Sequence, residues 1–206
     1  MASETKECIM KTALKLFAQS GYLGTSMNDI AKQLGITKAA LYKHYTSKQD
    51  ILNRIVERMN EMDMQRAKQF EMPHGDIDEA VKSYRHTPIE KIRAYSKAQF
   101  LHWTEEDFSS CFRKMLTLEQ YRDPKMTELY QKYLAAGPVD YMTSVFREMT
   151  DSDNAAHLLA LEFYGPVFLL YSIYDKTKDK ELTVNLLEKH IDCFASKIEF
   201  NRVKDE

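Results

Sequence analysis

The sequence predicts an all-α fold in which a three-helix N-terminal domain precedes a larger helical domain. Apolar residues recur at the spacing of helices along the whole chain, and no stretch alternates like a half-buried strand. The 206 residues include only six glycines and five prolines, which are too few for the turns of a many-stranded sandwich. The length is sufficient for a core in one or two compact domains.

Four helices are expected near the N-terminus, of which the second and third are short. The first covers about 4–20 and stops at Gly21, a residue suited to the position after a helix. Ser26 and Asp29 have the spacing of a capping box, with Asp in place of Glu, and open a short helix that ends at Gly35. The third helix covers about 38–44 and is capped by Thr37. The fourth, a longer helix, begins at Ser47.

The helical pattern breaks around 71–75 and 86–88, where prolines mark a connection that holds a short expected helix at 76–84. Five more helical segments follow at about 89–104, 106–121, 124–149 (interrupted by Gly137 and Pro138), 153–175 and 180–199. We therefore expect three parts: an N-terminal domain at 1–47, a connecting helix at 48–70 and a C-terminal domain at 71–206.

Charge is divided unevenly between these parts. The whole chain has 29 basic and 31 acidic side chains, a formal charge of −2. Residues 1–60 carry nine basic and five acidic side chains, a net charge of +4, so the remainder carries −6. A basic N-terminal part joined to an acidic remainder indicates two modules with different partners.

Residues 26–45 have the pattern of a helix-turn-helix. Gly35 can take the left-handed turn conformation, and Ala31 is small enough to let the second helix cross closely. That second helix then presents exposed groups that suit DNA bases and phosphates. The candidate DNA-binding residues on and beside the motif are Thr25, Ser26, Thr37, Lys38, Tyr42, Lys43, His44 and Lys48.

Several short runs within residues 9–56 stand at fixed spacing: Gly21-Tyr22, Thr25-Ser26, Ile30-Ala31, Gly35-Ile36-Thr37-Lys38, Leu41-Tyr42-Lys43-His44-Tyr45 and Ser47-Lys48. Together they resemble the TetR family of bacterial transcriptional regulators. Ala39 stands where the family often has Gly, Tyr45 where Phe is usual and Gln49 where Glu is usual.

The resemblance implies a role for each candidate. Thr25 and Ser26 would anchor phosphate, and His44 and Lys48 would clamp the DNA backbone. The residues that would face the major groove are Thr37, Lys38, Tyr42 and Lys43. It also implies a homodimeric regulator, most often a repressor, that binds a near-palindromic double-stranded operator and responds to a small-molecule effector.

The last two helical segments predict a dimer interface. Segment 153–175 is apolar around most of its circumference, and segment 180–199 carries apolar residues spaced by 4, 3 and 4. We interpret them as half of a four-helix interface, with the core of a monomeric bundle as the alternative. The expected interface residues are Leu159, Phe163, Leu170, Leu187, Ile191, Phe194 and Ile198.

The C-terminal composition suits a ligand pocket. The chain has eleven Met, twelve Tyr and ten Phe, mostly beyond residue 60, which fits an adaptable apolar pocket with a few hydroxyl groups. Such a pocket is also implied by the resemblance, whereas plain core packing is the alternative for each residue. The candidates are Tyr95, Gln99, Trp103, Met115, Glu119, Tyr121, Tyr141, Phe163 and Phe168.

Signals for catalysis, metal binding and membrane insertion are weak. The sequence has no Gly-rich phosphate loop, no Gly-x-Ser-x-Gly and no His-Glu-x-x-His, so we expect no enzyme, cofactor or metal. Three widely spaced cysteines fit a reducing cytoplasm, and the longest nearly apolar stretch, 163–174, is shorter than the roughly 20 residues of a membrane span. The alternative to a regulator is a helical small-molecule-binding or carrier protein without sequence-specific DNA binding.

Overall fold

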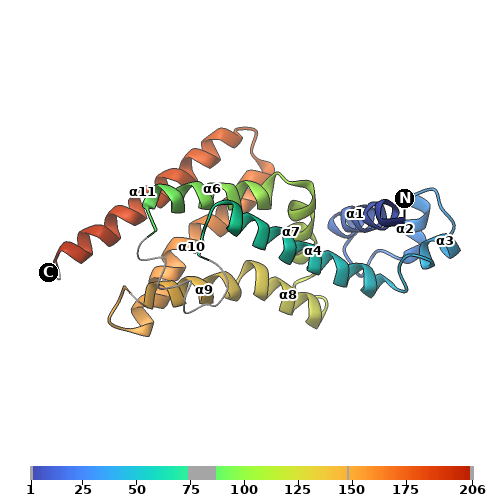
Figure 1. Ribbon diagram of the computed structural model, residues 1–206, viewed down its shortest axis with the longest axis horizontal. Helices are drawn as coiled ribbons and strands as arrows, with labels where there is room; N and C mark the ends of the chain where they lie inside the picture. The colour runs from blue at the N-terminus through green and yellow to red at the C-terminus, as the bar shows by residue number, and fades with distance from the viewer. Residues whose placement is uncertain (1, 74–86, 148, 205–206) are drawn as a thin grey trace. The chain divides into compact units, whose positions relative to one another are not determined.

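The computed structural model describes residues 2–73, 87–147 and 149–204, and every regular element in these ranges is an α-helix (Figure 1). This confirms the expected all-α fold. The short helix expected at 76–84 lies outside the described residues. The chain forms two compact units, Met1–Gln65 with Glu105–Gln131, and Arg66–Thr104 with Lys132–Glu206. The expected division at 1–47, 48–70 and 71–206 is a division by function, whereas the two units are defined by compactness. It therefore stays a prediction.

The first unit is built around α1. Its elements are α1 (Ala2–Ser20), α2 (Met27–Gln33), α3 (Lys38–Tyr42), the first part of α4 (Lys48–Gln69), α7 (Asp107–Glu119) and most of α8 (Pro124–Leu134). Helix α1 packs against α7 and α2, and α2 packs against α3. The core consists of fully buried apolar side chains, among them Ile9, Leu14, Phe17, Ile30 and Ile55. The helical periodicity predicts Ile9, Phe17, Ile30 and Ile55 to face inward.

Two features end α1 and place the chain that follows. The backbone N–H of Gly21 donates to the carbonyl of Phe17 at 3.0 Å, and Gly21 has a φ of +81°, in the left-handed region that favours glycine. A Cβ at this position would also collide with Oε1 of Glu119, the last residue of α7. Glycine is therefore required here by backbone conformation and by the close approach of α7.

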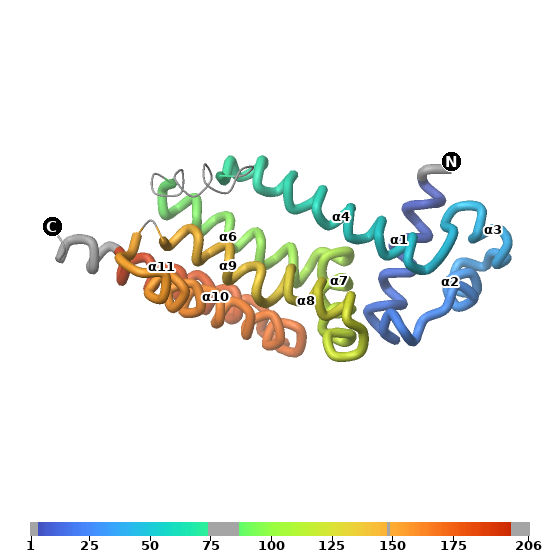
Figure 2. Tube along the Cα trace, turned by 90° about the horizontal axis from the view of Figure 1, so that it is seen from below, coloured from blue at the N-terminus to red at the C-terminus, as the bar shows by residue number. Residues whose placement is uncertain are grey.

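The second unit is a helical bundle. It contains the end of α4, then α6 (Ile89–Thr104), α9 (Ala136–Arg147), α10 (Asp153–Lys176) and α11 (Lys180–Lys204). Figure 2 shows α6, α9, α10 and α11 running alongside one another, and α10 packs against the other three. Phe100 stacks on Tyr171 with ring centroids 5.3 Å apart and meets the edge of Tyr174 at 5.4 Å, so aromatic packing joins α6 to α10.

The segment expected at 124–149 consists of two helices, α8 and α9, that meet at Ala135. Gly137 and Pro138 lie in the first turn of α9 rather than in a break. Proline is tolerated there because the first N–H groups of a helix have no partner within it. By contrast, Pro166 lies in the interior of α10, where it is exposed.

The expected dimer interface stays a prediction. Phe163, Leu170, Leu187, Ile191 and Phe194 are buried inside the second unit, and Leu159 and Ile198 are half-buried. Most of these side chains therefore already pack within one chain. The large apolar side chains that α10 and α11 leave exposed are Leu158, Leu161, Phe168, Leu169, Ile173, Leu182 and Leu186.

Helix α10 is long and apolar enough to cross a membrane, by length and composition alone. One third of its most apolar 18-residue stretch is buried in the protein.

We expect Gly21→Ala to destabilise the protein more than Gly35→Ala. Both glycines have positive φ, which costs other residues about 1–2 kcal/mol, but only Gly21 also meets a buried carboxylate, since nothing lies within 4 Å of a Cβ on Gly35. Urea unfolding of the two variants measures the difference. Equal losses of unfolding free energy would mean that Glu119 moves aside without cost.

Candidate nucleic-acid interface

The entry to α2 is fixed by a complete capping box. The Ser26 hydroxyl accepts the N–H of Asp29 at 3.2 Å, and the Asp29 carboxylate accepts the Ser26 N–H at 2.9 Å and its hydroxyl at 2.6 Å. The Ser26 hydroxyl and then its backbone N–H hold the pKa of Asp29 below its ordinary value of 3.8. The box was predicted from the sequence, and it sets where the first helix of the motif begins.

A tight turn sets the angle between α2 and α3. Gly35 has a φ of +66°, and the N–H of Ile36 donates back to the carbonyl of Ala31 at 3.0 Å. Ile30, Ala31 and Leu41 are buried between the helices, as the sequence predicts. The Thr37 hydroxyl accepts the N–H of Ala40 at 3.1 Å and so caps α3. These local contacts hold the two helices as one rigid piece.

Helix α3 presents the predicted DNA-facing residues together. Thr37, Lys38 and Lys43 are exposed, and Tyr42 is 42% exposed although it is a large aromatic residue. The ammonium of Lys38 lies 5.9 Å from the centroid of the Tyr42 ring. His44 is half-buried at the end of this segment. The structure thus gathers a compact, positively charged surface on a helix whose other side is in the core.

Lys48 and Thr25 hold the turn that precedes α2. The Lys48 ammonium donates to the carbonyls of Tyr22 and Thr25 at 2.6 and 2.7 Å and lies 4.3 Å from the Tyr22 ring centroid. Burial lowers the pKa of Lys48, and the negative charge of Glu119 opposes that shift. The buried Thr25 donates its hydroxyl to the carbonyl of Gly21 at 2.9 Å. Both polar groups are used inside the protein, and their phosphate contacts stay predictions.

Glu119, one of the expected ligand residues, lies beside the turn that precedes α2, and its ligand role stays a prediction. It is fully buried against Gly21, and neither carboxylate oxygen accepts a hydrogen bond in the part of the chain that the structure describes. It forms an ion pair with Arg122, whose Nη1 lies 3.8 Å from Oε1. An isolated buried carboxylate is costly. Sequence spacing could not reveal this contact, since 98 positions separate Gly21 from Glu119.

The other expected ligand residues fall into both units. Met115 is buried in the first unit, and Tyr121 there is 91% exposed, so it lines no interior space. In the second unit, Tyr95, Gln99 and Trp103 share one face of α6, Tyr141 lies on α9, and Phe163 and Phe168 lie on α10. Phe168 is exposed. Two of these residues are joined directly, since Nε2 of Gln99 lies 3.1 Å from the Tyr95 hydroxyl.

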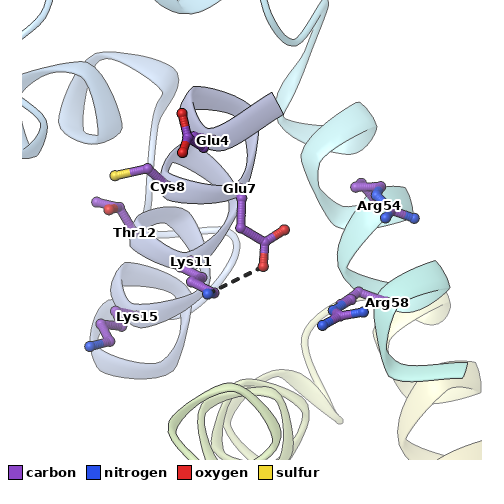
Figure 3. Close-up of a pocket in the computed structure, with 8 residues that line it drawn as sticks. All are labelled: Glu4, Glu7, Cys8, Lys11, Thr12, Lys15, Arg54 and Arg58. Carbon is purple, nitrogen blue, oxygen red and sulfur yellow. Dashed lines mark ion pairs between the residues drawn. The ribbon is translucent and has the colours of Figure 1, made fainter. Parts of the chain in front are cut away.

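A cleft of about 600 Å³ lies between α1 and α4 in the first unit (Figure 3). Its basic residues come in two pairs one helical turn apart, Lys11 and Lys15 on α1, and Arg54 and Arg58 on α4. All four are paired with carboxylates, for example Lys11 with Glu7 at 3.3 Å. Their charge is therefore balanced locally, in contrast to that of α3.

An exposed basic helix, held at a fixed angle behind a capped helix, defines a helix-turn-helix domain of the DNA-binding class. Residues 9–55 match the family model described as bacterial regulatory proteins, tetR family. The match covers these residues only, so the likeness to this family is shown for the N-terminal domain.

Individual relatives agree with that assignment. The chain is 43% identical over 56 residues to the HTH-type transcriptional regulator AcrR of Shigella flexneri, covering 27% of this chain and 26% of that protein. It is 44% identical over 52 residues to the biofilm operon negative transcriptional regulator IcaR of Staphylococcus epidermidis, covering 25% of this chain and 28% of that protein. The matches thus span about a quarter of these curated relatives.

Solved structures are similar in fold to this protein over most of its length. A TetR-family transcriptional regulator from Bordetella parapertussis superposes with a TM-score of 0.59 at 19% identity, covering 92% of this chain and 93% of that one. The complex of SmeT with triclosan gives a TM-score of 0.58 at 21% identity, covering 89% and 90%. At this identity the likeness concerns the fold alone.

We expect Asp29→Asn to lower stability at pH 7 and to have less effect in acid. Because the pKa of Asp29 is lowered in the folded state, its contribution is present above its ordinary value of 3.8 and is lost as pH falls through the lower folded value. Urea midpoints at pH 7 and pH 2.5 test this, with the exposed Asp140→Asn as control. A gap between wild type and variant that is equal at both pH values would contradict it.

Proposed function

We propose that the protein is a cytoplasmic homodimeric transcriptional regulator that binds a near-palindromic operator and leaves it when a small molecule binds the helical second unit. The observation that carries the proposal is the exposed basic face of α3, fixed by the capping box and by the left-handed turn at Gly35. Repression as the direction of control is supported by the relative named as a negative regulator. Response to a ligand is supported by the structural neighbour bound to triclosan.

On DNA, the residues would divide into two groups. Thr37, Lys38, Tyr42 and Lys43 would face the major groove, where side chains read base edges. Ser26, at the start of α2, and His44 would contact the sugar–phosphate backbone, which fixes the register of the protein on the duplex. In this division Lys48 and Thr25 act chiefly by holding the turn that places Ser26, because their polar groups already bond within the protein.

A second copy of the chain is the proposed partner of the exposed apolar stripe on α10 and α11. The stripe consists of Leu158, Leu161, Leu169 and Ile173 on α10 with Leu182 and Leu186 on α11. Leu158 and Leu169 are 59% and 60% exposed, and such continuous apolar exposure marks an interaction surface. Gly165 lies exposed between them, with nothing within 4 Å of a Cβ, so a partner helix could approach closely.

Dimerisation would set the spacing of the two DNA-reading helices. Two α3 helices related by a two-fold axis enter successive major grooves when their centres are about 34–36 Å apart or a multiple of that distance. A ligand that prefers a different spacing would weaken DNA binding, and by linkage DNA would weaken ligand binding by the same factor.

The central test is the binding of duplex DNA from beside the protein's own gene. We expect salt-dependent binding, and we expect Lys43→Ala to reduce the salt slope of the binding constant by about one unit, as the loss of one phosphate contact does. Fluorescence anisotropy over a range of salt concentrations measures this, with the exposed Lys125→Ala on α8 as control. An unchanged slope would remove Lys43 from the interface, and no binding in the absence of effector would overturn the proposed function.

Tyr42→Ala should change which operators are preferred rather than lower all affinities equally. Its exposed ring lies on the face of α3 that would meet base edges. Selection from a randomised operator library gives the readout. A uniform loss across the library would place Tyr42 on phosphate or in a purely structural role.

Leu169→Glu should weaken the dimer by at least about 100-fold, because a dimer would have to bury the new charge without a partner. The monomer should keep its fold, since Leu169 is 60% exposed. Light scattering after size exclusion reports the mass, and Leu118→Glu on α7 is a matched control at 44% exposure. A variant that stays dimeric would require another interface.

A further inference from the structure

The cleft between α1 and α4 carries positive charge that the proposed DNA interface does not use. Its volume of about 600 Å³ is within the range of small-molecule sites, and all the residues that line it belong to the first unit. Four basic and two acidic side chains line it, a formal charge of +2. The carboxylates that pair with three of the four cations, Asp107, Glu57 and Glu61, lie outside this lining. The cleft is therefore a candidate site for an anion.

Charges from the two helices meet across the cleft. Figure 3 shows Glu7 and Lys11 on the side of α1 that faces α4, and Arg58 pointing from α4 towards α1. Lys11 and Glu7 form an ion pair at 3.3 Å, in which the side chains are 57% and 37% exposed. An exposed pair one helical turn apart contributes little to stability. A stronger anion can therefore displace Glu7 from Lys11 at little cost.

Arg58 keeps most of its hydrogen-bonding capacity for a ligand. Its ion pair with the described residues joins Nη1 to Oε2 of Glu61 at 3.2 Å, so Nε and Nη2 make no hydrogen bond to any residue that the structure describes. Oε1 of the same carboxylate accepts Nη1 of Arg54 at 2.9 Å, which holds the two guanidinium groups on one side of α4. The neighbouring N–H donors of a guanidinium can bind two oxygens of one anion at once.

Competition with Glu7 decides which anion fits. A ligand with one carboxylate offers Lys11 the same charge and the same two oxygens as Glu7, which is already tethered beside it, so the exchange gains nothing. A phosphate monoester carries a charge of about −1.5 to −2 at pH 7 and three acceptor oxygens. It can therefore replace Glu7 on Lys11 and still offer oxygens to Arg58.

We propose that this cleft binds the phosphate group of a small phosphate monoester, with Lys11 from α1 and Arg58 from α4 as the binding residues. The volume leaves room beside the phosphate for the organic part of the molecule. The site lies in the first unit, whereas the effector of the proposed function binds the second. The inference therefore goes beyond the proposed function and does not rest on it.

Isothermal titration calorimetry of the full chain tests the preference for phosphate. Glucose 6-phosphate is compared with glucuronate, the same sugar with a carboxylate as its sixth carbon, at pH 7.5 and constant ionic strength. We expect one glucose 6-phosphate per chain, bound at least about tenfold more tightly than glucuronate. Inorganic phosphate distinguishes the two sources of the group, because weaker binding than the ester identifies an ester as the ligand and tighter binding identifies free phosphate. Equal affinities for the ester and glucuronate, or no binding of either phosphate, would overturn the proposal.

Two variants test the binding residues, one on each helix. Lys11→Gln and Arg58→Gln should each lower the affinity for glucose 6-phosphate about tenfold, because each removes a charge-assisted hydrogen bond. Thermal unfolding checks that both variants stay folded. Lys125→Gln on α8 and Lys43→Gln on α3 remove the same charge outside the cleft, and their affinities should stay within about twofold of wild type. Equal losses in the controls, or a loss in only one of the two cleft variants, would overturn a ligand that bridges α1 and α4.

Glu7→Gln should change the affinity in the opposite direction. It removes the tethered competitor of the ligand, so glucose 6-phosphate should bind severalfold more tightly. Weaker binding would contradict the competition on which the choice of phosphate depends. If Lys11→Gln and Arg58→Gln leave phosphate binding unchanged and each lower the salt slope of operator binding by about one unit, these cations contact DNA and the proposal fails.

Discussion

The bonds from the Lys48 ammonium to the carbonyls of Tyr22 and Thr25 are the constraint on which the DNA-reading part depends. They connect the first residue of α4 to the turn between α1 and α2. On the other side of that turn, Gly21 leaves just enough room for the buried carboxylate of Glu119. The turn is therefore held from α4 and from α7 at once, and the position of Ser26, where α2 begins, follows from both.

This arrangement suggests how a signal could reach DNA. Glu119 lies at the end of α7, and its negative charge raises the pKa of Lys48 against the larger, lowering effect of burial. Its carboxylate has no hydrogen bond in the described part of the chain, so its place is set by packing more than by bonding. A small displacement of α7 would therefore change the environment of Lys48 and of the turn that it holds.

The parts of the structure that could be predicted from the sequence are those set by neighbours in the chain. The capping box of Ser26 and Asp29, the turn at Gly35 and the cap at Thr37 depend on residues within about four positions of one another, and all were predicted. The contact of Glu119 with Gly21 joins distant segments, and the local sequence of neither segment predicts it. The residues of the expected dimer interface stay a prediction for a related reason. Periodicity identifies the apolar faces of α10 and α11, but which face the chain itself covers depends on α6 and α9.

The apolar stripe on α10 and α11 has a consequence for the amount of protein in a cell. In the proposed dimer a second copy covers this surface, which would tie folding to association, so the unfolding midpoint would rise with protein concentration. At low copy number the chain would lose the dimer and part of its stability together. Occupancy of the operator would then fall more steeply than simple dilution implies, and the number of copies would itself be a regulatory variable.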